Sequence, residues 1–352
     1  MGYRYIGSKE KLANQIIDLI IQEVPDANTV IDLMAGTGNF SLALRKRGFK
    51  VVASDVMSYS IHHLTVNLLL TNNPFFNGLV NTIPGLFLNC NSNFNRVLEF
   101  LNNIPGEYGY FFNEFSPDGN PQNASKPRMY YTSDNAKKID AIRSYIKKWH
   151  DENLISEIEH SLLIHTLILD SNDIANIAGT YGHYLSHFVQ RSLEPIILKQ
   201  CAIDTSNNIE HTIIQGYAED VSGKISGDVC YIDPPYIKRQ YAANYHILET
   251  IAREDTPPAI GESGLRPWRD QYSNFCSKLK IRDSFTQIIN NIKCNNIFIS
   301  YSEDGLLSLD ELKDFFTKFG QIKIFTIEHK RFKSNGSSKS SKITEYLIYL
   351  KK

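Results

Sequence analysis

The sequence contains few cysteines, and none of them lies close to another. They occur at Cys90, Cys201, Cys230, Cys276 and Cys294 in a chain of 352 residues. No Cys/His pattern with zinc-ligand spacing accompanies them, which argues against a structural zinc site and against a disulfide framework. Buried free thiols in a reducing compartment are the simplest account. No histidine is paired with an acid at metal-ligand spacing either, so we expect no metal.

A long apolar run is also missing. The longest one, around residues 162–169, is interrupted by His165 and ends at Asp170, which is too short to cross a bilayer. The first residues, MGYRYIGSKEK, lack the apolar core that a signal peptide needs. We therefore expect a cytoplasmic protein with no membrane partner.

Neither sign of charge predominates. The chain has 37 Lys and Arg against 38 Asp and Glu, a net charge of −1, and a pI near 6.8. This balance argues against a protein whose whole surface neutralises phosphate, as a histone does. Local basic clusters at residues 128–148 and 330–342 still allow contact with nucleic acid, although a charge run is most often a solvated surface.

Size and composition are those of a globular protein with more than one core. A chain of this length exceeds what a single hydrophobic core usually supports. Its hydrophobic content of 42% and charged content of 21% are ordinary for a folded protein. One large domain with a substantial insertion, or two domains, is the resulting expectation.

Strand-like runs lie in the first and last thirds of the chain. Residues 29–33 form a short β-rich run, residues 39–47 have helical spacing after a glycine turn, and residues 50–54 form a second strand. This order of strand, turn, helix and strand is typical of a parallel α/β sheet. Further strands are expected at residues 228–232, 296–300, 322–328 and 345–350, the last two as a terminal antiparallel hairpin.

The middle of the chain shows no such alternation. Residues 135–148 and 161–177 have helical patterns, and a region of this length is too long for one loop. We predict an α/β, Rossmann-like fold with a C-terminal antiparallel hairpin and a mainly helical insertion. The expected parts are a discontinuous catalytic domain (1–72 and 212–352), the helical insertion (73–211), and a loop-rich second insertion within the catalytic domain (237–283).

A glycine loop joins the first strand to the first helix. The segment DLMAGTG contains Asp32, Ala35, Gly36, Thr37 and Gly38. Dinucleotide sites need a third glycine, where this chain has Ser41. A carboxylate ahead of the loop suits a cationic ligand without phosphate better, and S-adenosylmethionine is such a ligand. Asp55 ends the next strand, about where an acid binds ribose hydroxyls.

The sharpest motif is the sequence Asp233-Pro234-Pro235-Tyr236 directly after a buried strand. The two prolines hold the chain extended, because each fixes its own φ and disfavours helix in the residue before it. The Asp233 carboxylate and the Pro234 carbonyl could accept the two N–H groups of an exocyclic amine. Tyr236 could stack on the base and hold it in line.

These motifs together resemble the adenine-specific DNA methyltransferases of the Dam-like group, in which the cofactor motif precedes the catalytic motif. The resemblance covers most of the catalytic domain. It is carried by the N-terminal RYIGSK, the glycine loop, Asp55, the Glu219-Asp220 pair, DPPY, Asn244-Tyr245-His246 and Ser334-Asn335-Gly336.

The resemblance implies an S-adenosylmethionine-dependent enzyme of a restriction-modification system that methylates N6 of a flipped-out adenine in double-stranded DNA. It implies that Tyr5 and Lys9 line the methionine end of the cofactor site, that Asp55 binds ribose and Asp220 the cofactor adenine, and that Asp233 lies against the cofactor. Glu219 could replace Asp220. The helical insertion would recognise the target sequence, and a cognate restriction endonuclease is an expected functional partner.

Candidate DNA contacts come from basic and amide side chains, which reach phosphates and base edges. The candidates are Arg128, Arg143, Lys238, Arg239, Lys333 and Asn335. Three other functions stay open at this point: an RNA adenine methyltransferase, an inactive methyltransferase-like DNA-binding module, and an NAD-dependent reductase. The reductase is disfavoured by Ser41 and by the lack of a Ser/Tyr/Lys constellation near the glycine loop.

Overall fold

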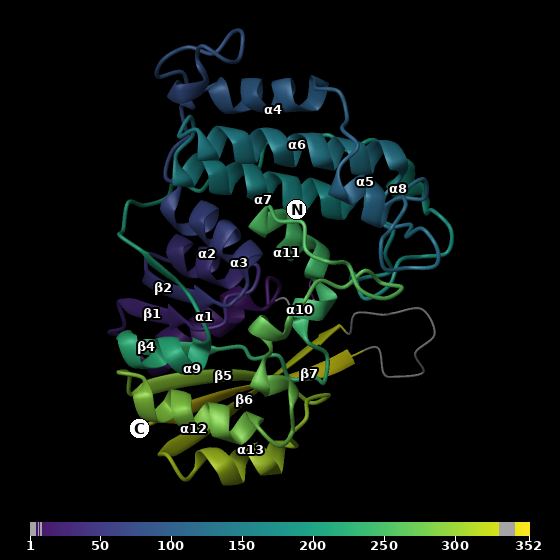
Figure 1. The fold of residues 1–352 in the computed structure, drawn as a ribbon. Coiled ribbons are helices and arrows are strands. Elements are labelled where there is room, and N and C mark those ends of the chain that lie inside the picture. Colours follow the sequence, from purple (N-terminus) through teal and green to yellow (C-terminus); the bar gives the residue numbers. More distant parts are fainter. Residues whose placement is uncertain (1–4, 6, 8, 331–341) are drawn as a thin grey trace. The chain divides into compact units, whose positions relative to one another are not determined.

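The computed structural model describes residue 5, residue 7, residues 9–330 and residues 342–352 (Figure 1). The chain divides into two compact units. The first, here called the helical unit, comprises Met1–Ile6, Thr65–Thr205 and Ala242–Asp270. The second, the sheet unit, comprises Gly7–Leu64, Ser206–Tyr241 and Gln271–Lys352.

A mixed sheet forms the centre of the sheet unit, with strand order β3-β2-β1-β4-β5-β7-β6. Strands β1 to β5 pair in parallel, and the hairpin of β6 and β7 joins β5 in antiparallel pairing. The bounds are β1 Thr29–Asp32, β2 Lys50–Asp55, β3 Thr212–Gln215, β4 Val229–Ile232, β5 Asn296–Ser302, β6 Gln321–Lys330 and β7 Lys342–Lys351. The predicted fold class is confirmed.

Helices cover both faces of this sheet (Figure 1). On one side lie α2 (Asn39–Lys46) and α3 (Ser58–Leu64), with α1 (Ala13–Glu23) packed on α2. The other side carries α9 (Ala218–Val221), α12 (Ile281–Asn291) and α13 (Leu309–Phe316), whose apolar side chains share one core with β1, β4, β5 and β7. Because both faces are covered, β4 is buried along its whole length, as the continuous apolar run indicates.

The strand order reverses next to β1. From β1 the sheet continues to β2 and β3 on one side, and to β4 and β5 on the other. In open α/β sheets such a reversal separates the loops that follow the two central strands, and ligands bind outside their carboxyl ends. The loops after β1 and β4 are the glycine loop and the DPPY segment.

The sequence reading missed β3. This strand has only four residues, is at the edge of the sheet, and alternates poorly, with exposed Thr212 and Gln215 flanking two half-buried isoleucines. The strand is defined by its hydrogen bonds to β2, whereas its sequence has no apolar alternation that would predict it.

The helical unit is built around two long helices, α6 (Ser133–Asp151) and α7 (Glu157–Asp173). Both were predicted, although α7 begins earlier than expected, at a capping box of Ser156 and Glu159, and ends four residues before position 177. Shorter helices are α4 Asn93–Asn103, α5 Tyr110–Phe115, α8 Gln190–Leu193, α10 Tyr241–Asn244 and α11 His246–Arg253, with single turns at Thr65–Leu69, Asn77–Leu79 and Arg269–Gln271. The sheet unit has further single turns at Ser222–Lys224 and Asn274–Cys276.

The unit boundaries differ from the predicted domains. The helical unit takes Thr65–Thr205 in place of 73–211, and it also takes Ala242–Asp270, which was assigned to an insertion within the catalytic domain at 237–283. The reason is the packing of α11, whose Ile247, Leu248 and Ile251 are fully buried and which contacts α7. Periodicity alone does not tell which core a short amphipathic helix joins.

Two arginines predicted to contact DNA are buried inside the helical unit. Arg128 has no exposed surface, pairs with Glu114 at 2.5 Å and donates to the carbonyls of Ala259, Gly261 and Glu262. Arg143 donates to the carbonyls of Thr250 and Asp255. Both guanidiniums bind the 242–270 segment, so the prediction that they contact DNA is wrong.

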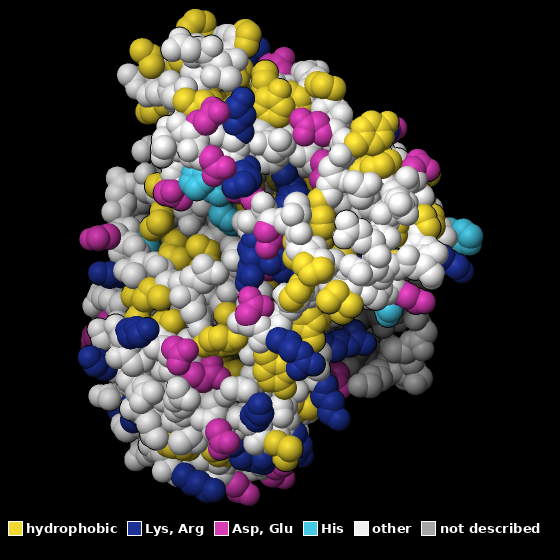
Figure 2. Space-filling view, in the orientation of Figure 1, with side chains coloured by type: hydrophobic (Ala, Val, Ile, Leu, Met, Phe, Trp, Pro, Cys, Tyr) yellow, Lys and Arg dark blue, Asp and Glu magenta, His cyan; other side chains and the backbone are white. Residues whose placement is uncertain are grey.

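The surface drawn in Figure 2 has Lys and Arg side chains scattered among Asp and Glu side chains. This arrangement agrees with the net charge of −1. Within the described part of the chain, none of the helices has the length and apolar character needed to cross a membrane.

We predict that Arg128→Ala lowers the free energy of unfolding by about 3–5 kcal/mol, because it leaves the Glu114 carboxylate and several carbonyls buried without their donor. Urea unfolding measures this. The matched control is Arg96→Ala, which removes an exposed pair with Glu99 and should change stability by less than about 0.5 kcal/mol. An Arg128→Ala protein of wild-type stability but weakened DNA binding would restore the original assignment.

Candidate active site

Three carboxylates follow neighbouring strands at one edge of the sheet. Asp32 ends β1, Asp55 ends β2, and Asp233 directly follows β4. In the parallel registers Asp32 lies opposite Ala53 on one side and opposite Tyr231 on the other. All three acids therefore emerge at the carboxyl edge, beside the reversal in strand order.

The glycine loop turns sharply above β1. Gly36 and Gly38 have φ values of +55° and +72°, in the left-handed region that favours glycine. The Gly36 N–H donates to Oδ2 of Asp55 at 2.8 Å, and Oδ1 of the same carboxylate accepts from the Met57 N–H at 2.9 Å. Two backbone donors thus fix the orientation of Asp55 against the loop.

Asp32 lies beneath the loop and is almost completely buried. Burial raises the pKa of its carboxyl to about 7, and the negative charges of Asp233 and Asp55 act in the same direction. The Ser41 hydroxyl donates to Oδ2 at 2.6 Å and partly offsets this rise. Ser41 occupies the position of the third glycine in a dinucleotide site. In this chain its hydroxyl serves as the hydrogen-bond donor to Asp32.

A buried ammonium group joins Asp233 to a second acid. Lys9 Nζ lies 2.9 Å from Asp233 Oδ1 and 3.2 Å from Glu345 Oε1. The side chains of Lys9 and Glu345 are 5% and 2% exposed, while that of Asp233 is 18% exposed. The Ser300 hydroxyl donates to the same Glu345 oxygen at 2.8 Å. Asp233 is thus the member of the cluster that retains access to solvent.

The cluster sets the charge of each member. Burial raises the pKa of Asp233 to about 6, with Lys9 opposing the rise and Glu345 adding to it. Burial lowers the pKa of Lys9, but the two carboxylates outweigh burial and raise it well above its ordinary value. Lys9 is therefore a permanent cation, and Asp233 is mainly ionised at neutral pH.

The ring of Tyr236 packs beside this cluster. Lys9 Nζ lies 5.3 Å from its ring centroid, and the Leu306 N–H donates to its carbonyl at 2.9 Å. Gly7 has a φ of +75°, and a Cβ there would lie 3.5 Å from the Tyr236 hydroxyl and 3.2 Å from the Tyr241 hydroxyl. Burial raises the pKa of Tyr236 to about 12, so its ring stays uncharged.

Comparison with known proteins decides the family. The family model described as D12 class N6 adenine-specific DNA methyltransferase matches residues 5–315. The chain belongs to this class. The match confirms the family resemblance drawn from the sequence.

Relatives cover the chain almost completely. Type II methyltransferase M.FokI of Planomicrobium okeanokoites is 33% identical over 363 residues, and modification methylase StsI of Streptococcus sanguinis is 30% identical over 356. The chain spans 52% of the length of each. Type II methyltransferase M.NlaIII of Neisseria lactamica is 30% identical over 358 residues, with 99% of both chains covered.

The sheet unit brings together most of the predicted cofactor and catalytic residues. Lys9, Asp32, the loop 35–38, Asp55 and the segment 233–236 lie at one edge of the sheet. Their roles stay predictions. Tyr5 lies in the helical unit, where it stacks on Tyr245 with ring centroids 4.6 Å apart.

The contacts of the two acids favour Asp220 over Glu219 as the residue predicted to bind the cofactor adenine. The Glu219 carboxylate accepts from the Ser284 hydroxyl at 2.6 Å, whereas Asp220 is exposed in α9 after β3. Of the candidate DNA contacts, Lys238 and Arg239 are exposed. Lys333 and Asn335 lie outside the described residues.

Sequence reasoning missed Glu345 and Ser300. Glu345 lies within the last strand, β7, and Ser300 within β5, so neither is in a loop motif. The sequence did contain a signal for Glu345, since it is a charged residue within the β-rich run ITEYLIYL, and the sheet buries it. A buried charge needs a partner of opposite sign, which is Lys9 here.

We predict that Lys9→Met destabilises the protein by about 3–5 kcal/mol at pH 8, because it leaves two buried carboxylates without their cation. Lys9 opposes the rise in the pKa of Asp233, so without Lys9 the folded-state pKa of this carboxyl lies further above its unfolded value. The penalty should therefore be small at pH 5 and should grow as the pH rises. Unfolding by urea at several pH values tests this.

The control for this experiment is Lys313→Met, which removes an exposed lysine paired with Asp310 and should show no such pH dependence. If Lys9→Met costs the same at pH 5 and pH 8, Lys9 does not compensate the charges of Asp233 and Glu345.

Proposed function

We propose that this chain is a site-specific DNA methyltransferase that transfers a methyl group from S-adenosylmethionine to N6 of an adenine flipped out of double-stranded DNA. The observation that carries the proposal is the position of Asp233 and Tyr236. They follow β4 at the strand-order reversal, next to the glycine loop after β1, with Asp233 held by Lys9. Membership of the N6 adenine-specific class supports the same reaction.

The residues around the glycine loop fit S-adenosylmethionine, which supplies an electrophilic methyl group on a cationic sulfur. Among the described residues at this edge of the sheet, Asp32, Asp55 and Asp233 outnumber one buried cation, Lys9. Burial raises the pKa of Asp32 to about 7, so this site gains from a positively charged ligand. We propose that Tyr5, Lys9, Asp32, Ala35, Gly36, Thr37, Gly38, Asp55, Asp220 and Asp233 form the cofactor site.

The DPPY segment suits an exocyclic amine. The adenine amino group is nearly planar and a weak nucleophile, because its lone pair is delocalised into the ring. The ionised Asp233 carboxylate and the Pro234 carbonyl accept its two N–H groups and aim the lone pair at the methyl group. Pro235 keeps this segment extended, and Tyr236 stacks on the base. After transfer the amine is cationic and acidic enough to lose a proton without a tuned base.

Base flipping costs a few kcal/mol, which stacking and hydrogen bonding at the site must recover. A neutral tyrosine ring beside a fixed carboxylate provides both interactions. Lys238 and Arg239 follow Tyr236 in the chain and are exposed, so we propose them as DNA contacts, with Lys333 and Asn335 as further candidates. Phosphate contacts of this kind fix the register of the protein on DNA.

A cognate restriction endonuclease is the proposed functional partner. The names of its relatives, Type II methyltransferase and modification methylase, support this inference. Single-molecule sequencing of DNA from cells that express the chain reports the modified base and its sequence context together.

We predict that Asp233→Ala lowers the rate of methyl transfer to DNA by at least about 10²-fold, since it removes an acceptor that orients the amine in the transition state. Transfer of labelled methyl groups to DNA and to RNA measures this. Lys313→Met serves as the control with unchanged activity. Methylation of RNA but not DNA would favour the RNA enzyme, and no methylation by the wild-type chain would favour the inactive module.

We also predict that S-adenosylmethionine binds about tenfold more tightly at pH 7 than at pH 6. A cation nearby lowers the pKa of Asp32 from about 7, which gives about fivefold, and that of Asp233 from about 6, which gives about twofold, and each carboxyl releases a proton. Calorimetry in buffers of different ionisation enthalpy measures affinity and proton release together. Asp32→Asn should reduce the pH dependence to about twofold or less, the share expected from Asp233 with its pKa of about 6. An unchanged dependence in Asp32→Asn contradicts the assignment.

A further inference from the structure

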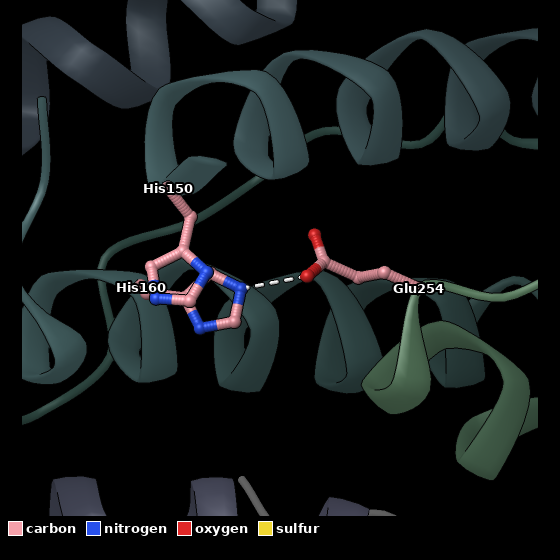
Figure 3. A group of neighbouring side chains, drawn as sticks. All are labelled: His150, His160 and Glu254. Carbon is pink, nitrogen blue, oxygen red and sulfur yellow. Dashed lines mark hydrogen bonds and ion pairs between the residues drawn. The ribbon is translucent and has the colours of Figure 1, made fainter. Parts of the chain in front are cut away.

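Three potential metal ligands meet within the helical unit, outside the motifs described above. His150 lies in the last turn of α6, His160 in the first turn of α7, and Glu254 directly after α11. Each offers one ligand atom, and these atoms all lie within 4.8 Å of one another (Figure 3). Glu254 is 94 residues from His160 in the chain.

The spacing suits one small ion. His160 Nε2 lies 2.8 Å from Glu254 Oε2, and the two imidazole rings stack with centroids 4.0 Å apart and an interplanar angle of 11°. Figure 3 shows the rings one above the other, with His160 facing the carboxylate. Two ligand atoms that each lie about 2.1 Å from a tetrahedral zinc ion are about 3.4 Å apart. This separation falls between the 2.8 Å from His160 Nε2 to Glu254 Oε2 and the 4.8 Å within which all three ligand atoms lie.

A second observation points to a missing cation. Oε1 of Glu254 is buried and has no hydrogen-bond partner among the described residues. The side chains of His160 and Glu254 are only 7% and 8% exposed. A buried carboxylate oxygen without a donor is costly, and the neighbouring Arg143 guanidinium donates to the Thr250 and Asp255 carbonyls.

The hydrogen bond between His160 and Glu254 explains the position of one carboxylate oxygen only. It leaves Oε1 unaccounted for, and it gives no reason for His150 to stack on the same imidazole. A metal ion bound by both histidines and the carboxylate explains the three features together. The side chain of His150 is 29% exposed, which gives an ion a path from solvent.

We propose that His150, His160 and Glu254 bind one zinc-class ion, with water in the fourth position. Glu157, whose Oε1 lies 2.9 Å from His150 Nε2, is outside this group of ligands. Two imidazoles and one carboxylate favour Zn²⁺ over Mg²⁺ or Ca²⁺, which prefer oxygen ligands. The sequence did not predict this site, because its expectation of no metal rested on close spacing along the chain.

The ion has a structural role inside the helical unit. His150 and His160 belong to Thr65–Thr205, and Glu254 belongs to Ala242–Asp270. One ion on all three side chains ties these two segments together, in addition to the hydrogen bonds of Arg128 and Arg143 to the second segment. The proposal is independent of the methyl-transfer chemistry, since none of its residues belongs to the sheet unit.

The test uses the full chain after removal of metal by a chelator. Equilibrium dialysis against Zn²⁺ gives stoichiometry and affinity for the wild type, His160→Gln, Glu254→Gln and a control, His187→Gln, whose side chain is exposed. We expect one tightly bound ion in the wild type and in the control, and at least about tenfold weaker binding in the other two variants. Zn²⁺ should also raise the melting temperature of the wild type and the control alone.

Cobalt substitution identifies the ligands. Five free cysteines could bind zinc adventitiously, but a histidine and carboxylate site gives a Co²⁺ spectrum without a thiolate charge-transfer band. Circular dichroism of the Gln variants checks that they are folded, and Glu254→Gln keeps the shape of the side chain if His160→Gln does not fold. Equal zinc affinity in wild type and Glu254→Gln, a thiolate band, or no binding by the wild type would each overturn the proposal.

Discussion

The parallel pairing of β1 with both β2 and β4 is the constraint on which the candidate site depends. Parallel strands end at the same edge, so this pairing brings Asp32, Asp55 and Asp233 together from positions far apart in the chain. Like charges at such an edge repel, and burial penalises each of them. The structure compensates locally with backbone N–H groups on Asp55, the Ser41 hydroxyl on Asp32, and Lys9 on Asp233. A site with this excess of buried negative charge favours a cationic ligand, which distinguishes it from a pyrophosphate site on a similar sheet.

The terminal hairpin contributes to this charge balance as well as closing the sheet. In its antiparallel register on β5, Glu345 of β7 lies opposite Ser302, and its carboxylate reaches Lys9 and the Ser300 hydroxyl. Glu345 therefore holds the ammonium group on one side while Asp233 holds it on the other. Because Glu345 and Lys9 are buried and Asp233 is partly exposed, the pair fixes a carboxylate that can still meet a substrate. In the proposed reaction Asp233 would thereby be oriented before a base arrives, which is the condition for efficient alignment of a weak nucleophile.

The predictable part of this protein is the part encoded by neighbouring residues. Strands such as β4, the glycine turn and the DPPY segment follow from local runs, φ preferences and the rigidity of proline, and the sheet confirms their order. Glu345 could not be located in the same way, because its role depends on a strand register set by pairing over long range. The burial of Arg128 could not be predicted for the same reason, because its partners Ala259 and Gly261 lie more than a hundred residues away in the chain. Local patterns give the elements, and long-range packing decides which charges remain at the surface.

This last point bears on how the chain meets DNA. Arg128 and Arg143 are buried and donate hydrogen bonds to backbone carbonyls of the 242–270 segment. The basic cluster at residues 128–148 therefore contributes less positive charge to the surface of the helical unit than its sequence indicates. The net charge of −1 argues against a surface that is basic throughout, so local donors are the expected DNA contacts. Lys238 and Arg239 follow Tyr236 by two and three residues, an extended reach of about 7–10 Å. A phosphate bound there would lie near the ring that we propose stacks on the target base, so one short segment would set both the register of the backbone and the position of the base.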